Sequence, residues 1–171
     1  SQLAVFEGGC TLEAAEAIID LEAFDPDLWV MDVLEKLVDH SLLRRVEPIE
    51  GHVRYQMTRS VQIYALEKSV DKHDVRRRHA EYYAQFGTAE SIRSMGHVDR
   101  SREALLEVDN CRAALEAALG DQDFESACGC ALVVGRVALW RGPFGLTADW
   151  LENLIGIVPE GPARVRLQLL L

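Results

Sequence analysis

The chain has 171 residues, 49% of them hydrophobic, which suits one or two packed domains and excludes wholesale disorder. No apolar run approaches the roughly 18–20 residues that span a bilayer, so no membrane contact is expected. The net charge of −10 is uneven, with ten acids and one base in residues 1–41 and nine bases and five acids in residues 42–79.

Both ends interrupt an apolar pattern, in residues 3–6 and again in residues 167–171. We therefore expect this sequence to be part of a longer protein. Thr11 is typical of a helix N-cap, and Leu12, Ala15 and Ile18 then recur at helical spacing. Asp25-Pro26 predicts a second helix start, and the helix over 28–39 has apolar residues on one face.

Two strands follow, predicted over 42–47 and 53–57, with a turn over 48–51. Val53, Tyr55 and Met57 alternate with polar residues, which predicts a half-buried strand. Two helices followed by a hairpin are the pattern of a winged helix, whose wing is the hairpin. Residues 1–70 are therefore predicted to form a winged-helix domain.

The remainder of the chain is predicted to be helical. Val75, His79, Tyr82, Tyr83 and Phe86 form an apolar stripe, on which we expect His79 to be a packed core histidine. Residues 71–100 are predicted to be a linker helix and a loop. Helices follow over about 101–119, 123–141, 146–157 and 162–171. Their many small residues let antiparallel helices approach closely, which predicts tetratricopeptide-like helical hairpins over 101–171. The fold class is thus mainly α.

The sequence carries no pattern of a catalytic or metal site. It has no phosphate-binding Gly-x-x-x-x-Gly-Lys loop, and no nucleophile arrangement is supported by helical spacing. The spacing of the four cysteines fits no zinc motif, and we expect all four to be buried thiols in a reducing cytoplasm. No cofactor is expected in this part of the protein.

DNA is the natural partner of a winged helix, but the helix over 28–39 carries Asp32, Glu35 and Asp39 against a single Lys36. These acids would repel phosphates, so nucleic acid is an unfavoured partner and contact with protein is favoured. The bases lie in the hairpin instead. Arg44, Arg45 and Arg54 are candidates for an interdomain contact or for DNA, and a solvated hairpin face is the plain alternative.

Several strings together resemble one family, the STAND-class signal-transduction ATPases of the NB-ARC type, in which a winged helix and repeats follow a nucleotide-binding domain. The strings are Leu3 to Ala15, Val33 to Leu43, Arg54 to Met57 with Tyr64 to Glu67, Arg76 to Tyr83, and Glu107 to Leu115. The family's Met-His-Asp sensor motif matches Met57, Thr58 and Arg59, of which only Met57 agrees.

The resemblance implies a non-catalytic regulatory fragment that couples nucleotide state to partner binding or transcriptional output. ATP or ADP would bind an upstream domain of the same chain, and that domain would be one partner. The repeats would bind a protein or self-associate, and Trp140, Phe144 and Trp150 are candidate aromatic anchors there, with core packing as the alternative. The rival hypothesis is a DNA-binding winged-helix transcriptional regulator.

Overall fold

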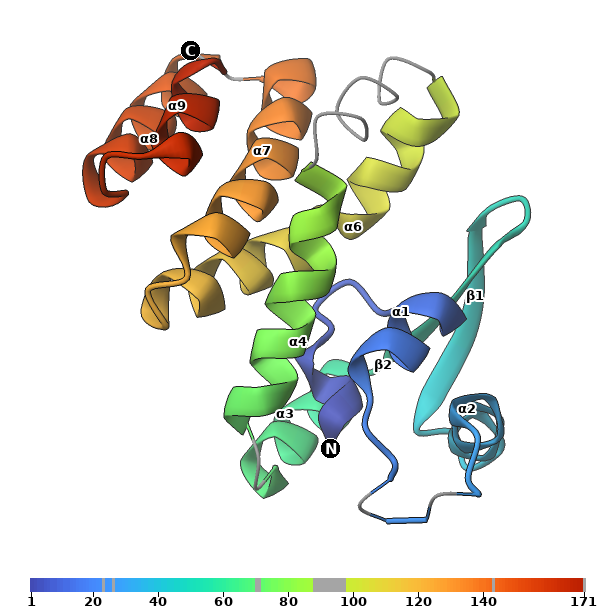
Figure 1. The fold of residues 1–171 in the computed structure, drawn as a ribbon. Coiled ribbons are helices and arrows are strands. Elements are labelled where there is room, and N and C mark those ends of the chain that lie inside the picture. The colour runs from blue at the N-terminus through green and yellow to red at the C-terminus, as the bar shows by residue number, and fades with distance from the viewer. Residues whose placement is uncertain (23, 26, 70–71, 88–97, 143, 171) are drawn as a thin grey trace. The chain divides into compact units, whose positions relative to one another are not determined.

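The computed structural model describes residues 1–171 except 23, 26, 70–71, 88–97, 143 and 171 (Figure 1). The chain forms two compact units, Ser1–His79 and Ala80–Leu171, each considered by itself below. In the part of the chain that the structure describes, no helix combines the length and the apolar character needed to cross a membrane.

The first unit is a winged helix, as predicted. Its elements in chain order are η1 (Gln2–Val5), α1 (Leu12–Ile18), α2 (Val30–Asp39), β1 (Leu43–Ile49), β2 (His52–Met57), α3 (Arg59–Lys68) and the start of α4 (Lys72–Ala84). The two strands are antiparallel, and Cys10 adds a short bridge to Tyr55 on the edge of β2. α2 packs against α1 and β1, which places it beside the hairpin.

The helix over residues 12–18 begins where the sequence predicts. The hydroxyl of Thr11 accepts a hydrogen bond of 3.1 Å from the backbone NH of Ala14, which satisfies one of the free donors of the first turn. Ala14, Ala15 and Ile18 are buried, so the predicted apolar face is the one that packs.

The predicted helix start at Asp25 is wrong. The carboxylate of Asp25 accepts a hydrogen bond of 3.0 Å from the backbone NH of Asp27 and so forms a local turn. α2 begins later, at Val30, and its N-cap Trp29 makes no side-chain cap. A capping acid serves a turn as well as a helix, and the apolar stripe that begins at Val30 decides where this helix starts.

The wing is longer than predicted. β1 continues through Pro48 and Ile49, and the turn is confined to Glu50 and Gly51. Gly51 has φ +79°, a backbone conformation that favours glycine. The pairing shifts register between Val46 and Ile49, which accommodates the proline in a strand where its missing NH would otherwise break the ladder.

The core of the first unit joins its N-terminal residues to α3 and α4. The ring centroids of Phe6 and His79 lie 5.4 Å apart, and His79 is fully buried, so the prediction of a core histidine is confirmed. The guanidinium of Arg78 donates a hydrogen bond of 2.7 Å to the carbonyl of Ile18 at the end of α1. Both contacts hold residues at the end of the first unit against residues near its beginning.

The second unit is helical in its described residues. Its elements are the end of α4, η2 (Gln85–Gly87), α6 (Val98–Gly120), α7 (Phe124–Arg141), α8 (Phe144–Ile157) and α9 (Pro162–Gln168). α7 is central and packs against α6, α8, α9 and η2 (Figure 1). The four helices predicted after residue 100 are therefore present, although α6 starts earlier. Most of the predicted loop before it lies outside the described residues.

Small residues allow the helices around α7 to approach closely. A Cβ added at Gly129 would lie 2.8 Å from the Cα of Ala84, so only glycine fits there. The thiol of Cys128 lies 3.2 Å from the carbonyl oxygen of Ala163, to which it donates. The side of α7 that carries these residues is completely buried, as its small-residue composition predicted.

Candidate nucleic-acid and protein interfaces

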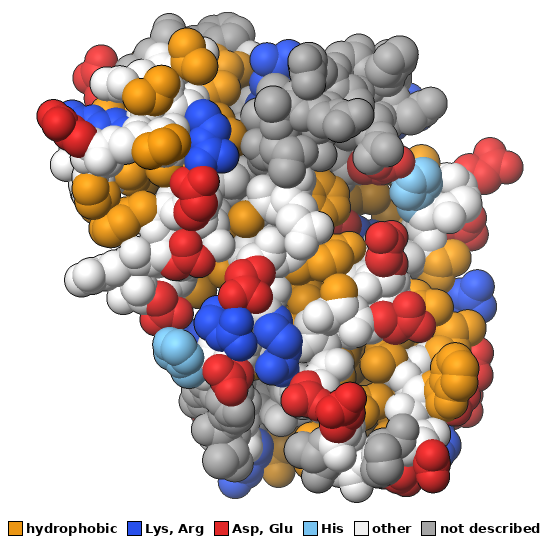
Figure 2. Space-filling view, viewed as in Figure 1, with side chains coloured by type: hydrophobic (Ala, Val, Ile, Leu, Met, Phe, Trp, Pro, Cys, Tyr) orange, Lys and Arg blue, Asp and Glu red, His pale blue; other side chains and the backbone are white. Residues whose placement is uncertain are grey.

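The outer face of α2 is acidic. Leu34 is fully buried on the inner face, whereas Asp32, Glu35 and Asp39 are exposed and follow one another at spacings of three and four residues. Residues at this spacing share one side of a helix. Figure 2 shows red and orange side chains together in the region of α2. The position that would enter the major groove in a winged helix thus carries negative charge.

The wing carries the exposed positive charge. Arg44 pairs with Gln56 and Arg45 with Tyr55 in the hairpin, and both arginines are exposed. Since successive residues of a strand point to opposite faces, the two guanidinium groups lie on opposite faces of the wing. They do not form a single patch.

Arg54 does not belong with them. Its side chain is 1% exposed, and its guanidinium donates hydrogen bonds to the carbonyl oxygens of Gly8, at 3.3 Å, and of Gly9, at 2.9 Å. The predicted alternation expected Arg54 on the solvent side, which is wrong because residues 8–10 cover that side of β2. An arginine committed to these carbonyls has no free guanidinium for DNA or for another domain.

The sensor-motif positions lie where β2 leads into α3. Met57 is half-buried at the end of β2, and Thr58 is the N-cap of α3 but makes no side-chain cap. The guanidinium of Arg59 forms a 2.9 Å ion pair with Glu7 and a 3.0 Å hydrogen bond with the amide oxygen of Gln62. Arg59 therefore contacts the start of the chain.

Sequence reasoning missed Gln62. This residue is 4% exposed, and its amide NH₂ donates to the carbonyl oxygens of Ala4 and Phe6, both at 3.1 Å. A polar residue in an ordinary helix pattern gives no signal of such a contact, because its acceptors lie more than 50 residues away in the chain. Gln62 fixes η1 on α3 and, through Arg59, joins the sensor-motif positions to that contact.

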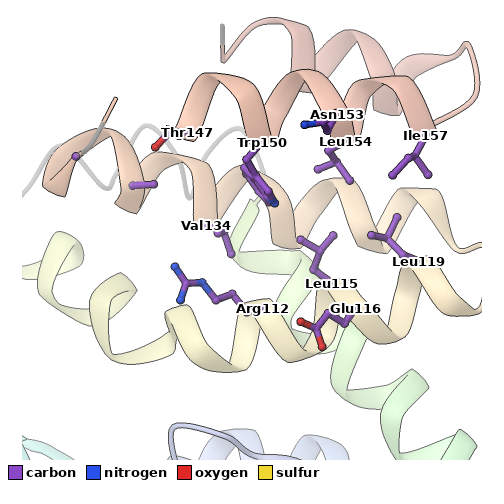
Figure 3. Close-up of a pocket in the computed structure, with 12 residues that line it drawn as sticks. Arg112, Leu115, Glu116, Leu119, Val134, Thr147, Trp150, Asn153, Leu154 and Ile157 are labelled. Atoms are coloured by element: carbon purple, nitrogen blue, oxygen red, sulfur yellow. The ribbon is translucent and has the colours of Figure 1, made fainter. Parts of the chain in front are cut away.

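A groove of about 540 Å³ lies within the second unit (Figure 3). α6 supplies one side, α8 the opposite side and α7 the floor, and most of the lining is apolar. The lining residues are Arg112, Leu115, Glu116, Leu119, Val134, Ala138, Gly142, Thr147, Trp150, Asn153, Leu154 and Ile157. The indole of Trp150 projects from α8 toward the floor (Figure 3). The volume is within the range of ligand and peptide sites, which begins at about 300 Å³.

The three candidate aromatics are not brought together. Trp150 lines the groove, whereas Trp140 does not and is 40% exposed on α7. The guanidinium carbon of Arg136 lies 5.9 Å from the centroid of the Trp140 ring, so this indole already has a cation partner. The side chain of Phe144 lies outside the described residues.

All four cysteines are buried free thiols. Burial raises the pKa of Cys130 to about 12, and it raises the pKa of Cys111 well above the ordinary value. Such thiols stay protonated and are poor nucleophiles and poor metal ligands at neutral pH. Among the described residues, no three His, Cys, Asp or Glu side chains gather in a way that would hold a metal ion.

The chain is similar to one protein family and to several individual proteins. Residues 1–69 match the family described as a winged helix-turn-helix domain. Three mycobacterial proteins, two from Mycobacterium tuberculosis strains and one from Mycobacterium bovis, are 38% identical over 118 residues. Each is named "Putative HTH-type transcriptional regulator". No solved structure matches.

The chain spans 13% of the length of these relatives, while 66% of the chain is matched. The matched share is larger than residues 1–69, so the similarity extends into the helices beyond the winged helix. The winged helix-turn-helix match also runs against the expectation that nucleic acid is an unfavoured partner, because DNA is the ordinary ligand of that domain.

Proposed function

We propose that this chain is a non-catalytic part of a transcriptional regulator and that its winged helix binds duplex DNA through the wing. The observation that carries the proposal is the match of residues 1–69 to a winged helix-turn-helix domain whose wing exposes Arg44 and Arg45. The names of the relatives support the same function. We also propose that the protein acts in the cytoplasm.

The geometry favours the wing over α2 as the DNA-contacting element. Three exposed acids on α2 would face phosphates at close range, and phosphate neutralisation supplies most non-specific affinity. A hairpin that enters a groove meets a phosphate backbone on each of its faces. Arg44 and Arg45 point to opposite faces, so each would contact one of the two phosphate backbones. Arginine is also a preferred side chain in a narrow minor groove.

Fluorescence polarisation with a labelled duplex of random sequence tests the proposal. The chain should bind at low salt, and the affinity should fall steeply as salt increases. Each phosphate contact contributes about 0.9 to the slope of log affinity against log salt, so Arg44→Ala/Arg45→Ala should reduce that slope by about 2. Arg102→Ala/Arg141→Ala, at exposed positions of the second unit, is the matched control. Absence of binding at low salt, or equal slopes for the two double variants, would refute wing binding.

A second candidate function is coupling to a nucleotide-binding domain, as the resemblance to STAND-class ATPases implies. The relatives extend far beyond the matched segment, which leaves room in them for further domains. The contacts of Arg59 with Glu7 and Gln62 connect the sensor-motif positions to the start of the first unit. ATP or ADP would bind that domain and not this chain.

Limited proteolysis of a longer protein that includes a nucleotide-binding domain tests this second function. Cleavage around residues 54–60 should differ between ADP and ATP, since a hinge between rigid bodies changes its exposure. Identical cleavage with the two nucleotides would contradict it.

In either function, the helices of the second unit are proposed to be tetratricopeptide-like and to bind a protein partner or a second copy in the groove beside Trp150.

A further inference from the structure

We infer that the outer face of α2 binds a segment of another protein that carries both basic and apolar side chains. This α2 face consists of Trp29, Met31, Asp32, Glu35 and Asp39, with one exposed base, Lys36, among the acids. The inference goes beyond DNA binding by the wing, and the two occupy different elements of the first unit. In other winged helices the corresponding helix would read DNA, whereas here we assign a protein partner to it.

The apolar part of the α2 face is unusually exposed for side chains of its size. Trp29 is 72% exposed and Met31 is 39% exposed, although the same helix buries Leu34 completely. Most of Trp29 and part of Met31 are therefore left uncovered by the packing of α2 in the first unit. Exposed tryptophan is the residue type that most often anchors a protein interface, because its burial removes a large apolar area from water.

The charge of the α2 face selects the partner. Its three acids outnumber its single base, Lys36, and no ion pair in the described part of the chain neutralises Asp32, Glu35 or Asp39. The segment that precedes α2 adds the exposed acids Asp20, Glu22, Asp25 and Asp27. A partner that presents lysine or arginine beside apolar side chains would neutralise these acids and cover Trp29 in one contact.

Other occupants fit less well. Duplex DNA and anionic membranes would meet the acids with charge of the same sign. A second copy would bring another acidic chain, since the net charge of each is −10. A basic segment is the complementary choice, and the apolar side chains on both partners would limit the loss of affinity in salt.

NMR titration of the ¹⁵N-labelled chain tests this inference with a short amphipathic helical peptide of leucine and lysine. Amide shifts should concentrate in residues 29–39, and a peptide of leucine and glutamate should cause none. Neutralising the face with Asp32→Asn/Glu35→Gln/Asp39→Asn should weaken binding about tenfold, as three modest ion pairs predict. Trp29→Ala should weaken it independently. Asp149→Asn/Glu152→Gln/Glu160→Gln in the second unit, where all three acids are exposed, is the matched control and should leave affinity unchanged.

Four outcomes would overturn the inference. Shifts spread over all acidic regions, or equal weakening by the two triple variants, would show nonspecific attraction. Shifts in α2 that grow with protein concentration in the absence of peptide would assign the face to a second copy. Shifts in α2 on addition of duplex would assign it to DNA. Because DNA binding is tested at Arg44 and Arg45, failure of one proposal leaves the other measurable.

Discussion

The guanidinium group of Arg54 donates a 2.9 Å hydrogen bond to the carbonyl oxygen of Gly9, a residue 45 positions earlier in the chain. This contact ties β2, the second strand of the wing, to the segment between η1 and α1, beside the bridge of Cys10 to Tyr55. Arg54, which resembles a surface residue in the sequence, is therefore a structural residue. Its substitution should lower the free energy of unfolding.

Arg54→Met should lower the free energy of unfolding by about 2 kcal/mol. The substitution keeps an apolar chain in the space but leaves the carbonyls of Gly8 and Gly9 without their charged donor. Urea unfolding followed by circular dichroism measures this. Arg44→Met, at an exposed position of the same hairpin, should change stability by less than about 0.5 kcal/mol. Similar losses in the two variants would contradict the assignment of Arg54 as a buried tie.

Gly9→Ala should destabilise the first unit by about 3 kcal/mol. Gly9 has φ +74°, and a Cβ there would lie 2.5 Å from the Cγ of Gln56 and 2.7 Å from the carbonyl oxygen of Tyr55. Gly51→Ala is the matched control, because φ is +79° but nothing lies within 4 Å. Gly51→Ala should cost only about 1 kcal/mol, from backbone strain alone. If the two variants unfold at the same urea concentration, Gly9 is not a site of close approach.

Gly129→Ala and Gly156→Ala should shift stability in opposite directions. Both glycines lie in helices, Gly129 in the interior of α7 and Gly156 in the last turn of α8, and alanine alone would add at most about 1 kcal/mol. A Cβ at Gly156 meets nothing within 4 Å, so this variant should be more stable. A Cβ at Gly129 would lie 2.8 Å from the Cα of Ala84, and the forced separation should outweigh the gain by about 1–3 kcal/mol. Thermal melting of both variants checks the sign, and stabilisation by Gly129→Ala would show that α7 has room at this point.

Ionisation of Cys130 should lower the free energy of unfolding at high pH. Burial raises its pKa from 9.0 to about 12 in the folded protein, so the protonated thiol is favoured by folding. The resulting stabilisation is fully present below about pH 9, where the thiol is protonated in both states, and is lost as pH rises toward about 12. Urea unfolding of the chain and of Cys130→Ala at pH 8 to 11 measures it. The variant should lose less stability over this range, and parallel curves would count against a buried, protonated thiol.

The local pattern of the sequence predicted the winged helix and the helices after residue 100. Thr11 and the apolar spacing that follows it were enough to define α1, because a cap and a helical stripe act within one or two turns. The acidic outer face of α2 was also predicted, since helix periodicity determines which residues share a side. The small residues of α7 predicted a closely packed helix for the same local reason.

Only the tertiary structure decided which polar groups are structural and which are free. Alternation in β2 predicted Arg54 on the solvent side, but the fold brings the carbonyls of Gly8 and Gly9 over it from a distant part of the chain. Trp140 and Trp150 were equivalent in the sequence, whereas the packing of α6, α7 and α8 leaves a groove that Trp150 lines and Trp140 does not. A periodic pattern specifies the face of an element, while the neighbour that covers that face comes from residues far along the chain, which no local pattern contains.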